Sequence, residues 1–558
     1  MRLTTVPDAK IRVFRAVPVG HKLYVALALY CALLLLAAPL FRYLLGPDLV
    51  AYISIARHYA TGDWADAVNT YWSPLVSWLT APLVLIGIPG LIAFKIVGIF
   101  AGAAALLATV KLARGFEISS GIQTVIVCTA ALMIASYSLT GSSTDVLVLA
   151  IALFYFKIIL DHSYEHSRTA GILCGLLGAL GFYAKAYIFC FFLVHFTAIT
   201  VLRLVRQTSS ARKRTLLNYL VGVAVFFAGC TPWLVAMHAK TGTLSLGTTG
   251  AWNYRMVGPK SPGFAQYYHL IPPPNPQAIS MWEAPSPDLL PAWHPLISLR
   301  SLEYQLKLIV HNCRSLRTFL LETSLFSFAA IFAYLVWGIS SGELARYRWP
   351  LVFATVLILP SGYLLISVEG RYVWPALLIV LLMGAVAIDA ATRSSKRLVR
   401  SVAITGYALS FALFPMKQLV GARNGGKALF LASSTLRDTI PAHSRMAACG
   451  SWNSSLALAY YLNLRFYGST GATSAERAVR AALIPGANPA TDPPSPTPAQ
   501  VADSLRANHI SYYLVWPACR VLPPAKLLTA PIALPGFQGV RIFRVAGSVN
   551  LDNIAAAE

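Results

Sequence analysis

Long apolar runs separated by short polar connections dominate roughly the first three quarters of the chain. Several of these runs reach the roughly 20 residues that an α-helix needs to cross the hydrocarbon core of a bilayer. Together with the charges that flank them, the runs predict about eleven membrane-spanning helices. They lie approximately at 23–45, 91–112, 121–139, 145–160, 170–185, 187–205, 215–237, 317–339, 349–368, 375–392 and 401–419.

Two longer connections, 46–90 and 239–315, interrupt this pattern. The second is rich in Pro, Trp and Tyr, and its aromatic residues argue for order because disordered segments are poor in them. It is either a belt of aromatic residues resting on the lipid headgroups or a lid over a substrate.

After residue 420 the pattern changes to short β-rich runs that alternate with helical pieces. Strands are predicted at 445–449, 464–467, 510–516 and 540–545, with helices near 453–463 and 498–508. This alternation predicts a small α/β domain. The turn from Gly450 to Asn453 is a weak signal for a ligand site, and a simple helix cap is the favoured interpretation. The predicted fold is a polytopic α-helical membrane module over 1–420, followed by an extracytoplasmic α/β domain over 421–558.

The distribution of basic residues predicts the orientation in the membrane. Lys10, Arg12, Arg15 and Lys22 precede the first apolar run, whereas the short connections on the opposite side carry few bases. Cytoplasmic connections are enriched in Lys and Arg, so the N-terminus is expected in the cytoplasm. An odd number of spans then places the C-terminal domain outside, and the expected location is the inner (plasma) membrane.

Composition supports the membrane assignment and excludes one partner. The chain is 57% hydrophobic and only 12% charged, about half the charged fraction of a soluble domain, with mean hydropathy +0.62. A net charge of +24 raises the question of nucleic acid, but the bases cluster at the ends of spans and no recognition motif accompanies them. No nucleic-acid partner is therefore expected. Cys449 and Cys519 fall in the C-terminal region and could pair in an oxidising compartment, which the sequence leaves open.

Ionisable residues recur at the predicted outer ends of several spans. A carboxylate at the edge of the hydrocarbon is costly to desolvate and usually faces a cavity or a pathway. Single residues also have simpler interpretations: Asp145 as a helix N-cap, Lys95 as a snorkelling side chain, and Glu369 with Arg371 as a local ion pair. Their common depth instead predicts one polar cavity at the outer leaflet. The candidate residues are Asp48, Arg57, His58, Lys95, Asp145, Lys185, Glu369, Arg371 and Tyr372.

This set of side chains suits a lipid-linked phosphate donor. Cations neutralise phosphate oxygens, and an arginine does so through a bidentate fork. A carboxylate such as Asp48 can deprotonate an acceptor hydroxyl as general base. The nearest acidic pair in the outer loops is Asp63 and Asp66, whose spacing is not that of an acidic metal motif. No metal and no cofactor are therefore expected.

Four segments resemble the GT-C superfamily of polyprenyl-phosphate-sugar glycosyltransferases, in the bacterial branch related to protein O-mannosyltransferases and the lipid A aminoarabinose transferase. They are GPDLVAYISIARHYATGDW with the following YWSP, TGSSTDVLVLAIALFYF, GALGFYAKAYIFCFFLVHF and EGRYVWPALL. The resemblance implies that Asp48 is the catalytic base and that Lys185 and Arg371 bind the lipid phosphate. Asp145 matches the second acidic position of the family. The chain departs from the family in Leu49, where the usual second acidic residue would stand, and in its α/β rather than β-trefoil C-terminal domain.

The expected function is transfer of a sugar, with inversion, from a polyprenyl phosphate to an extracytoplasmic acceptor, which is a lipid, a glycan or a protein. Asp48 and Asp145 are the expected catalytic residues, and the remaining candidates bind substrate. Membrane lipids are the other expected partners. Two alternatives are a lipid or sugar transporter or flippase, and a non-catalytic scaffold of the cell envelope.

Overall fold

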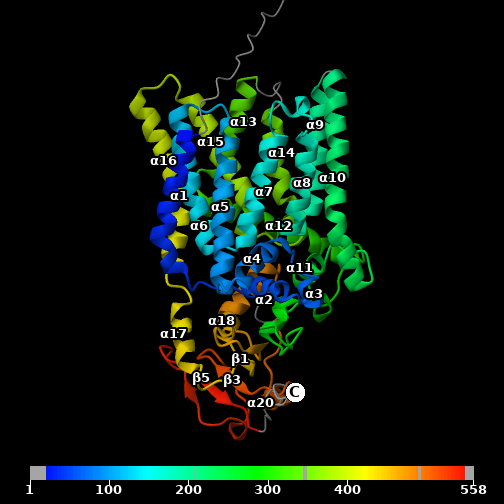
Figure 1. The fold of residues 1–558 in the computed structure, drawn as a ribbon, viewed down its shortest axis with the longest axis vertical. Helices are drawn as coiled ribbons and strands as arrows, with labels where there is room; N and C mark the ends of the chain where they lie inside the picture. The colour runs from blue at the N-terminus through cyan, green and yellow to red at the C-terminus, as the bar shows by residue number, and fades with distance from the viewer. Residues whose placement is uncertain (1–19, 208, 343–347, 488–491, 547–558) are drawn as a thin grey trace, which may run out of the picture.

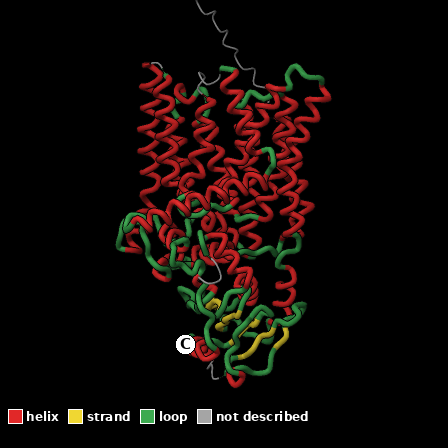
Figure 2. Tube along the Cα trace, turned by 180° about the vertical axis from the view of Figure 1, so that it is seen from behind, coloured by secondary structure: helices red, strands yellow, loops and turns green. Residues whose placement is uncertain are grey.

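A computed structural model describes residues 20–207, 209–342, 348–487 and 492–546. The basic residues Lys10, Arg12 and Arg15 lie outside the described residues. A bundle of long helices occupies one end of the molecule, and a small region containing the strands occupies the other (Figures 1 and 2). The bundle comprises α1 (Gly20–Phe41), α5 (Gly90–Arg114), α6 (Ser120–Thr140), α7 (Ser143–Ile159), α8 (Ala170–Ala184), α9 (Tyr187–Arg206), α10 (Ser209–Thr241), α13 (Ser327–Ser340), α14 (Arg348–Leu364), α15 (Trp374–Ala391) and α16 (Arg397–Ala422).

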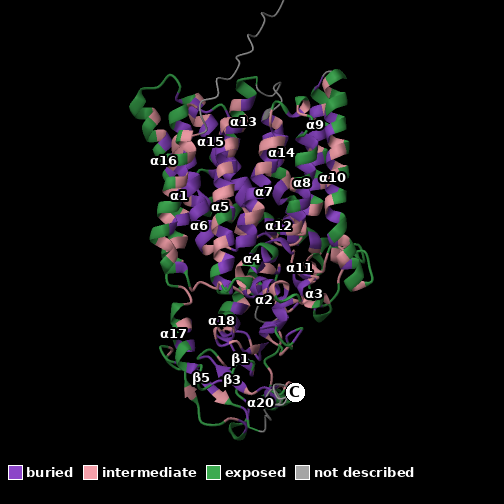
Figure 3. Cartoon of the chain, in the orientation of Figure 1, coloured by how far each residue is buried: buried purple, intermediate pink, exposed green. Residues whose placement is uncertain are grey.

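Except at 317–339, these helices coincide with the predicted spans. In the described part of the chain, seven helices are long and apolar enough to cross a bilayer, or up to eight if one bent pair counts as a single span. The central helix α15 is almost wholly buried, whereas α1 exposes large apolar residues such as Leu35 and Leu36 (Figure 3). An apolar exterior is stable only in lipid, because water would penalise it. The predicted class, a polytopic helical membrane protein, is confirmed.

The predicted span 317–339 is wrong in its first part. The chain breaks between α12 (Leu299–Thr323) and α13, and the two helices are bent by 94°. Ser324 ends α12 in an extended conformation, and its Oγ accepts a hydrogen bond from the Phe326 amide. Since α12 exposes Leu302, Leu306 and Val310 along one stripe among charged residues, it has the pattern of a helix that lies along the membrane surface.

The two long connections, 46–90 and 239–315, fold against each other at the strand-bearing end of the bundle. Residues 46–90 form α2 (Pro47–Thr61), α3 (Trp64–Ala67) and α4 (Leu75–Leu85). Residues 239–315 form α11 (Thr249–Met256), the short 3-10 turns η2 (Ala265–Tyr267), η3 (Met281–Glu283) and η4 (Pro287–Leu289), and most of α12. Tyr71 of the first connection and Trp252 and Trp282 of the second are buried in one aromatic cluster. The long connection is therefore ordered, as its aromatic content predicts.

The C-terminal region is an α/β unit. Its elements are α17 (Lys427–Leu436), β1 (Arg445–Cys449), α18 (Trp452–Leu462), β2 (Arg465–Ser469), α19 (Ser474–Leu483), α20 (Pro498–Ala507), β3 (Tyr512–Val515), β4 (Ile532–Ala533) and β5 (Arg541–Arg544). The sheet has the order β2-β1-β3-β5-β4, with β1 parallel to β2 and β3 and the remaining pairs antiparallel. Cys449 and Cys519 form a disulfide. The predicted strands and helices are present, while α17, α19 and β4 were not predicted.

The α/β unit is docked onto these two long connections. Ser280 of the long connection forms a bridge to Phe466 in β2, and α18 packs against α2. This contact fixes α2, the long connection and the sheet relative to one another, and it brings their side chains to one place beneath the bundle.

Candidate active site

Local sequence sets the orientation of α2. Gly46 is extended and Pro47 begins the helix, where its fixed φ is favourable and its missing N–H is not needed. Asp48 therefore lies in the first turn, where the helix dipole stabilises a carboxylate. The helix starts at the cavity described below and presents this carboxylate to it.

Arg371 joins three carboxylates from separate parts of the chain. Its Nη1 lies 2.8 Å from Asp48 Oδ2 and 3.5 Å from Asp145 Oδ2, and its Nε lies 2.8 Å from Glu369 Oε2. The local pair of Glu369 and Arg371 is therefore real but is part of a larger network. Trp282 completes it by donating its Nε1–H to Asp48 Oδ1 at 3.1 Å.

Lys185 and Asp145 form the second half of the network. Lys185 is extended between α8 and α9, and its Nζ donates to Asp145 Oδ1 at 2.7 Å. The interpretation of Asp145 as an N-cap is wrong, because Ser142 is the N-cap of α7 and the buried Asp145 carboxylate contacts Lys185 and Arg371 instead. Asp145 thus holds both cations at one point.

Tyr372 covers the cations from one side. Lys185 Nζ lies 3.7 Å from the centroid of the Tyr372 ring, and the Tyr372 hydroxyl donates to Glu369 Oε1 at 3.1 Å. A ring face attracts a cation electrostatically, so Tyr372 fixes the ammonium without neutralising it.

All of these groups line one cavity of about 580 Å3. Lys95 also lines it and donates its Nζ to the Phe41 carbonyl oxygen at the end of α1 at 2.8 Å. The structure therefore brings together seven of the nine candidates: Asp48, Lys95, Asp145, Lys185, Glu369, Arg371 and Tyr372. Their individual roles stay predictions.

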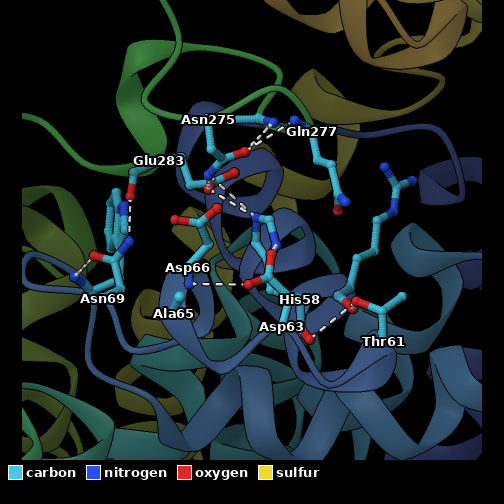
Figure 4. Close-up of polar contacts among 12 residues, drawn as sticks. His58, Thr61, Asp63, Ala65, Asp66, Asn69, Asn275, Gln277 and Glu283 are labelled. Carbon is cyan, nitrogen blue, oxygen red and sulfur yellow. Dashed lines mark hydrogen bonds and ion pairs between the residues drawn. The ribbon is translucent and has the colours of Figure 1, made fainter. Parts of the chain in front are cut away.

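The other two candidates, Arg57 and His58, do not line this cavity. The Arg57 guanidinium lies 5.6 Å from the centroid of the Tyr460 ring. His58 is buried, with Nδ1 2.8 Å from Asp63 Oδ2 and Nε2 3.2 Å from Glu283 Oε1 (Figure 4). Burial lowers the pKa of His58, but the hydrogen bonds and negative charges of Glu283 and Asp63 outweigh it, so the pKa is raised overall.

Sequence reasoning did not place several residues that line the cavity, among them Trp282, Trp452 and Asn453. Trp282 comes from the long connection, and Trp452 and Asn453 come from the start of α18. The turn before α18 was interpreted as a simple cap, but Ser451 makes no side-chain cap and the turn faces the cavity. The motif itself gave a weak signal for a ligand site.

No protein-family model and no curated protein sequence matches the chain. Solved structures do match it in fold. ArnT from Cupriavidus metallidurans bound to undecaprenyl phosphate superposes with a TM-score of 0.54 at 13% identity, over 95% of this chain and 98% of ArnT. The apo form of that ArnT gives 0.53 at 12% identity, over 94% and 96% of the two chains.

The oligosaccharyltransferase from Archaeoglobus fulgidus, in complex with zinc and sulfate, gives a TM-score of 0.53 at 11% identity, over 89% of this chain and 68% of that protein. The chain thus has the GT-C fold that its four segments predicted, along nearly its whole length.

Proposed function

We propose that this protein is a membrane glycosyltransferase that moves a sugar from a polyprenyl-phosphate donor to an extracytoplasmic acceptor. The observation that carries the proposal is the position of Arg371, which lies between Asp48 and Asp145 in a cavity that Lys185 also lines. Two cations beside a potential base are what a phosphate leaving group and an incoming hydroxyl require. The fold of an ArnT that binds undecaprenyl phosphate supports a polyprenyl phosphate as donor.

In the proposed reaction, Asp48 takes the proton of the acceptor hydroxyl as that oxygen attacks C1 of the sugar. The bond from C1 to the phosphate oxygen breaks, and the electron pair leaves with the polyprenyl phosphate. Lys185 and the fork of Arg371 stabilise the charge that develops on the phosphate. Attack opposite the leaving group inverts the configuration at C1.

The other groups have supporting roles in this proposal. Asp145 binds a sugar or acceptor hydroxyl and keeps the two cations in place, and Lys95, Glu369 and Tyr372 border the donor. The long connection, through Trp282, closes one side of the cavity. Phosphate is a good leaving group once its charge is balanced, so the reaction is proposed to proceed without a metal.

The proposed location is the inner membrane, with the cavity and the α/β unit on the extracytoplasmic side. The disulfide between Cys449 and Cys519 supports this side, because disulfides persist in oxidising compartments. A periplasm-active reporter such as alkaline phosphatase, fused after residue 558, is expected to be active. If this fusion were inactive and a cytoplasm-active reporter fused at the same position were active, the proposed orientation would be wrong.

The function is tested by incubating the purified protein with labelled polyprenyl-phosphate sugars and a lipid extract. Transfer is expected with the wild type, is expected to be lost with Asp48→Asn, and is expected to be retained with the control Asp503→Asn, whose carboxylate is 75% exposed on α20. Mass spectrometry of lipids from a deletion strain and its parent then identifies the acceptor through the missing glycoform. An absence of turnover with every donor would favour a scaffold.

A further inference from the structure

A second polar cluster lies next to the candidate active site but outside its cavity. His58 at the end of α2, Asp63 and Asp66 around the start of α3, and Glu283 in η3 converge there (Figure 4). One ligand atom from each of His58, Asp63 and Asp66 lies within 4.8 Å of the others. The proposed transfer reaction uses none of these four side chains.

The cluster contains polar atoms that the protein leaves without partners. Glu283 is 2% exposed, and its Oε2 is buried with no hydrogen-bond partner, although Oε1 of the same carboxylate contacts His58 and Asn275. Among the described residues, no hydrogen bond or ion pair is found for the Asp66 carboxylate, which is turned toward the space beside His58 and Glu283 (Figure 4). Leaving a buried carboxylate oxygen unpaired is costly, and buried polar atoms almost always have a partner, so such an atom points to a bound ligand.

The net charge of this cluster also favours the binding of a cation. Three carboxylates meet here, and one ammonium, that of Lys240, lies nearby. Lys240 directs its Nζ to the carbonyl oxygens of Ala65 and Val68 at 2.7 and 2.5 Å. Even with His58 protonated, the group keeps an excess negative charge, whereas a divalent cation bound to a neutral imidazole balances it.

We propose that His58, Asp63 and Asp66 hold a divalent transition-metal ion of the zinc class, with Glu283 bordering the site through its contact with His58 Nε2. One imidazole nitrogen with carboxylate oxygens is a donor set that suits zinc. Ligand atoms around a tetrahedral zinc lie roughly 3.4 Å apart, given metal–ligand distances of about 2.1 Å. The three ligand atoms lie within 4.8 Å of one another, so metal binding would draw them closer by up to about 1.4 Å.

The ion would have a structural role. It would join α2, which carries Asp48, to the turn η3, which carries Trp282 next to Glu283. The bound ion would thereby hold Asp48 and Trp282, which contact each other in the cavity, in a fixed relative position.

The test uses the full-length protein, stripped with a chelator and then titrated with zinc alone, with bound metal counted by elemental analysis and stability followed by thermal unfolding. The wild type is expected to bind one zinc per chain and to gain several degrees in Tm. Asp66→Asn is expected to weaken zinc binding by about 10–100-fold or more, and it removes no hydrogen bond of its side chain. Asp63→Asn provides a second variant if the first is poorly folded.

Two controls make the result specific. Asp503→Asn, at an exposed position, and Asp48→Asn, inside the candidate active site, are both expected to bind zinc like the wild type. Zinc binding that is absent from the wild type, unchanged in both Asp66→Asn and Asp63→Asn, or lost in Asp48→Asn would overturn the proposal. None of these readouts depends on transferase activity, so the proposed function and the metal site fail or succeed separately.

Discussion

Arg371 Nη1 lies 2.8 Å from Asp48 Oδ2, although the two residues are 323 positions apart in the chain. The contact links the first turn of α2 to the segment that precedes α15. In the same network Arg371 also reaches Asp145 and Glu369, so the guanidinium is shared among three carboxylates. A donor phosphate entering the cavity would compete for this guanidinium and release Asp48 to act as a base.

The first prediction concerns the fork of Arg371. Arg371→Lys keeps the charge but loses the planar pair of donors, so it cannot serve Asp48, Glu369 and a phosphate together. The kcat/KM for the donor is expected to fall by about 10–100-fold, corresponding to the roughly 1.5–3 kcal/mol of a charged hydrogen bond. The measurement is transfer from a labelled donor, with Arg541→Lys at the exposed first residue of β5 as the matched control. Equal rates for Arg371→Lys and the wild type would contradict the role of the fork.

A second prediction tests whether the hydrogen bond from Trp282 positions the Asp48 carboxylate for catalysis. Trp282→Phe retains most of the buried aromatic surface but removes the Nε1–H that donates to Asp48 Oδ1. The kcat is expected to fall by roughly 3–10-fold, since one hydrogen bond contributes about 0.5–1.5 kcal/mol, with little change in the KM for the donor. Rates are compared with those of Trp78→Phe, a substitution on α4 outside the cavity. A change confined to the KM would show instead that Trp282 binds the donor directly.

The third prediction concerns Lys185. Lys185→Gln removes one of the two cations beside the phosphate and leaves the buried Asp145 with Arg371 alone. The apparent affinity for the donor is expected to fall by about tenfold or more, and the protein is expected to lose about 1–3 kcal/mol of stability because a buried carboxylate loses a partner. Donor titrations and thermal inactivation measure the two effects, with Lys427→Gln at the exposed start of α17 as control. If Lys185→Gln bound the donor as tightly as the wild type, Lys185 would not be a donor-binding residue.

A fourth prediction addresses the disulfide. Cys449 and Cys519 close a segment with a sequence separation of 70, and cross-linking a segment of this size stabilises a protein by about 2–4 kcal/mol. The double variant Cys449→Ser with Cys519→Ser is expected to unfold at lower temperature and to be cleaved more readily by protease in the α/β unit. Alkylation before and after reduction, followed by mass spectrometry, is expected to label this pair only after reduction. Labelling of both thiols without reductant would show that they are free.

The sequence by itself determined the features that depend on local pattern. Apolar runs of bilayer length specify helices wherever they occur, so all of the spans except 317–339 were predictable one by one. Strand 445–449 was predictable because a short β-rich run bounded by a turn is also a local signal.

Only the tertiary structure decided which of these residues meet. The contact of Arg371 with Asp48, the insertion of Trp282, and the placement of His58 beside Glu283 rather than in the cavity all depend on how distant segments pack. The break between α12 and α13 also escaped prediction, since hydropathy cannot distinguish a helix that crosses the membrane from one that turns along its surface. Hydropathy reports whether each residue prefers water or lipid. It does not report which charged side chains pair with one another. That choice depends on the packing of the whole fold, because every buried carboxylate and cation must find a partner in the same arrangement.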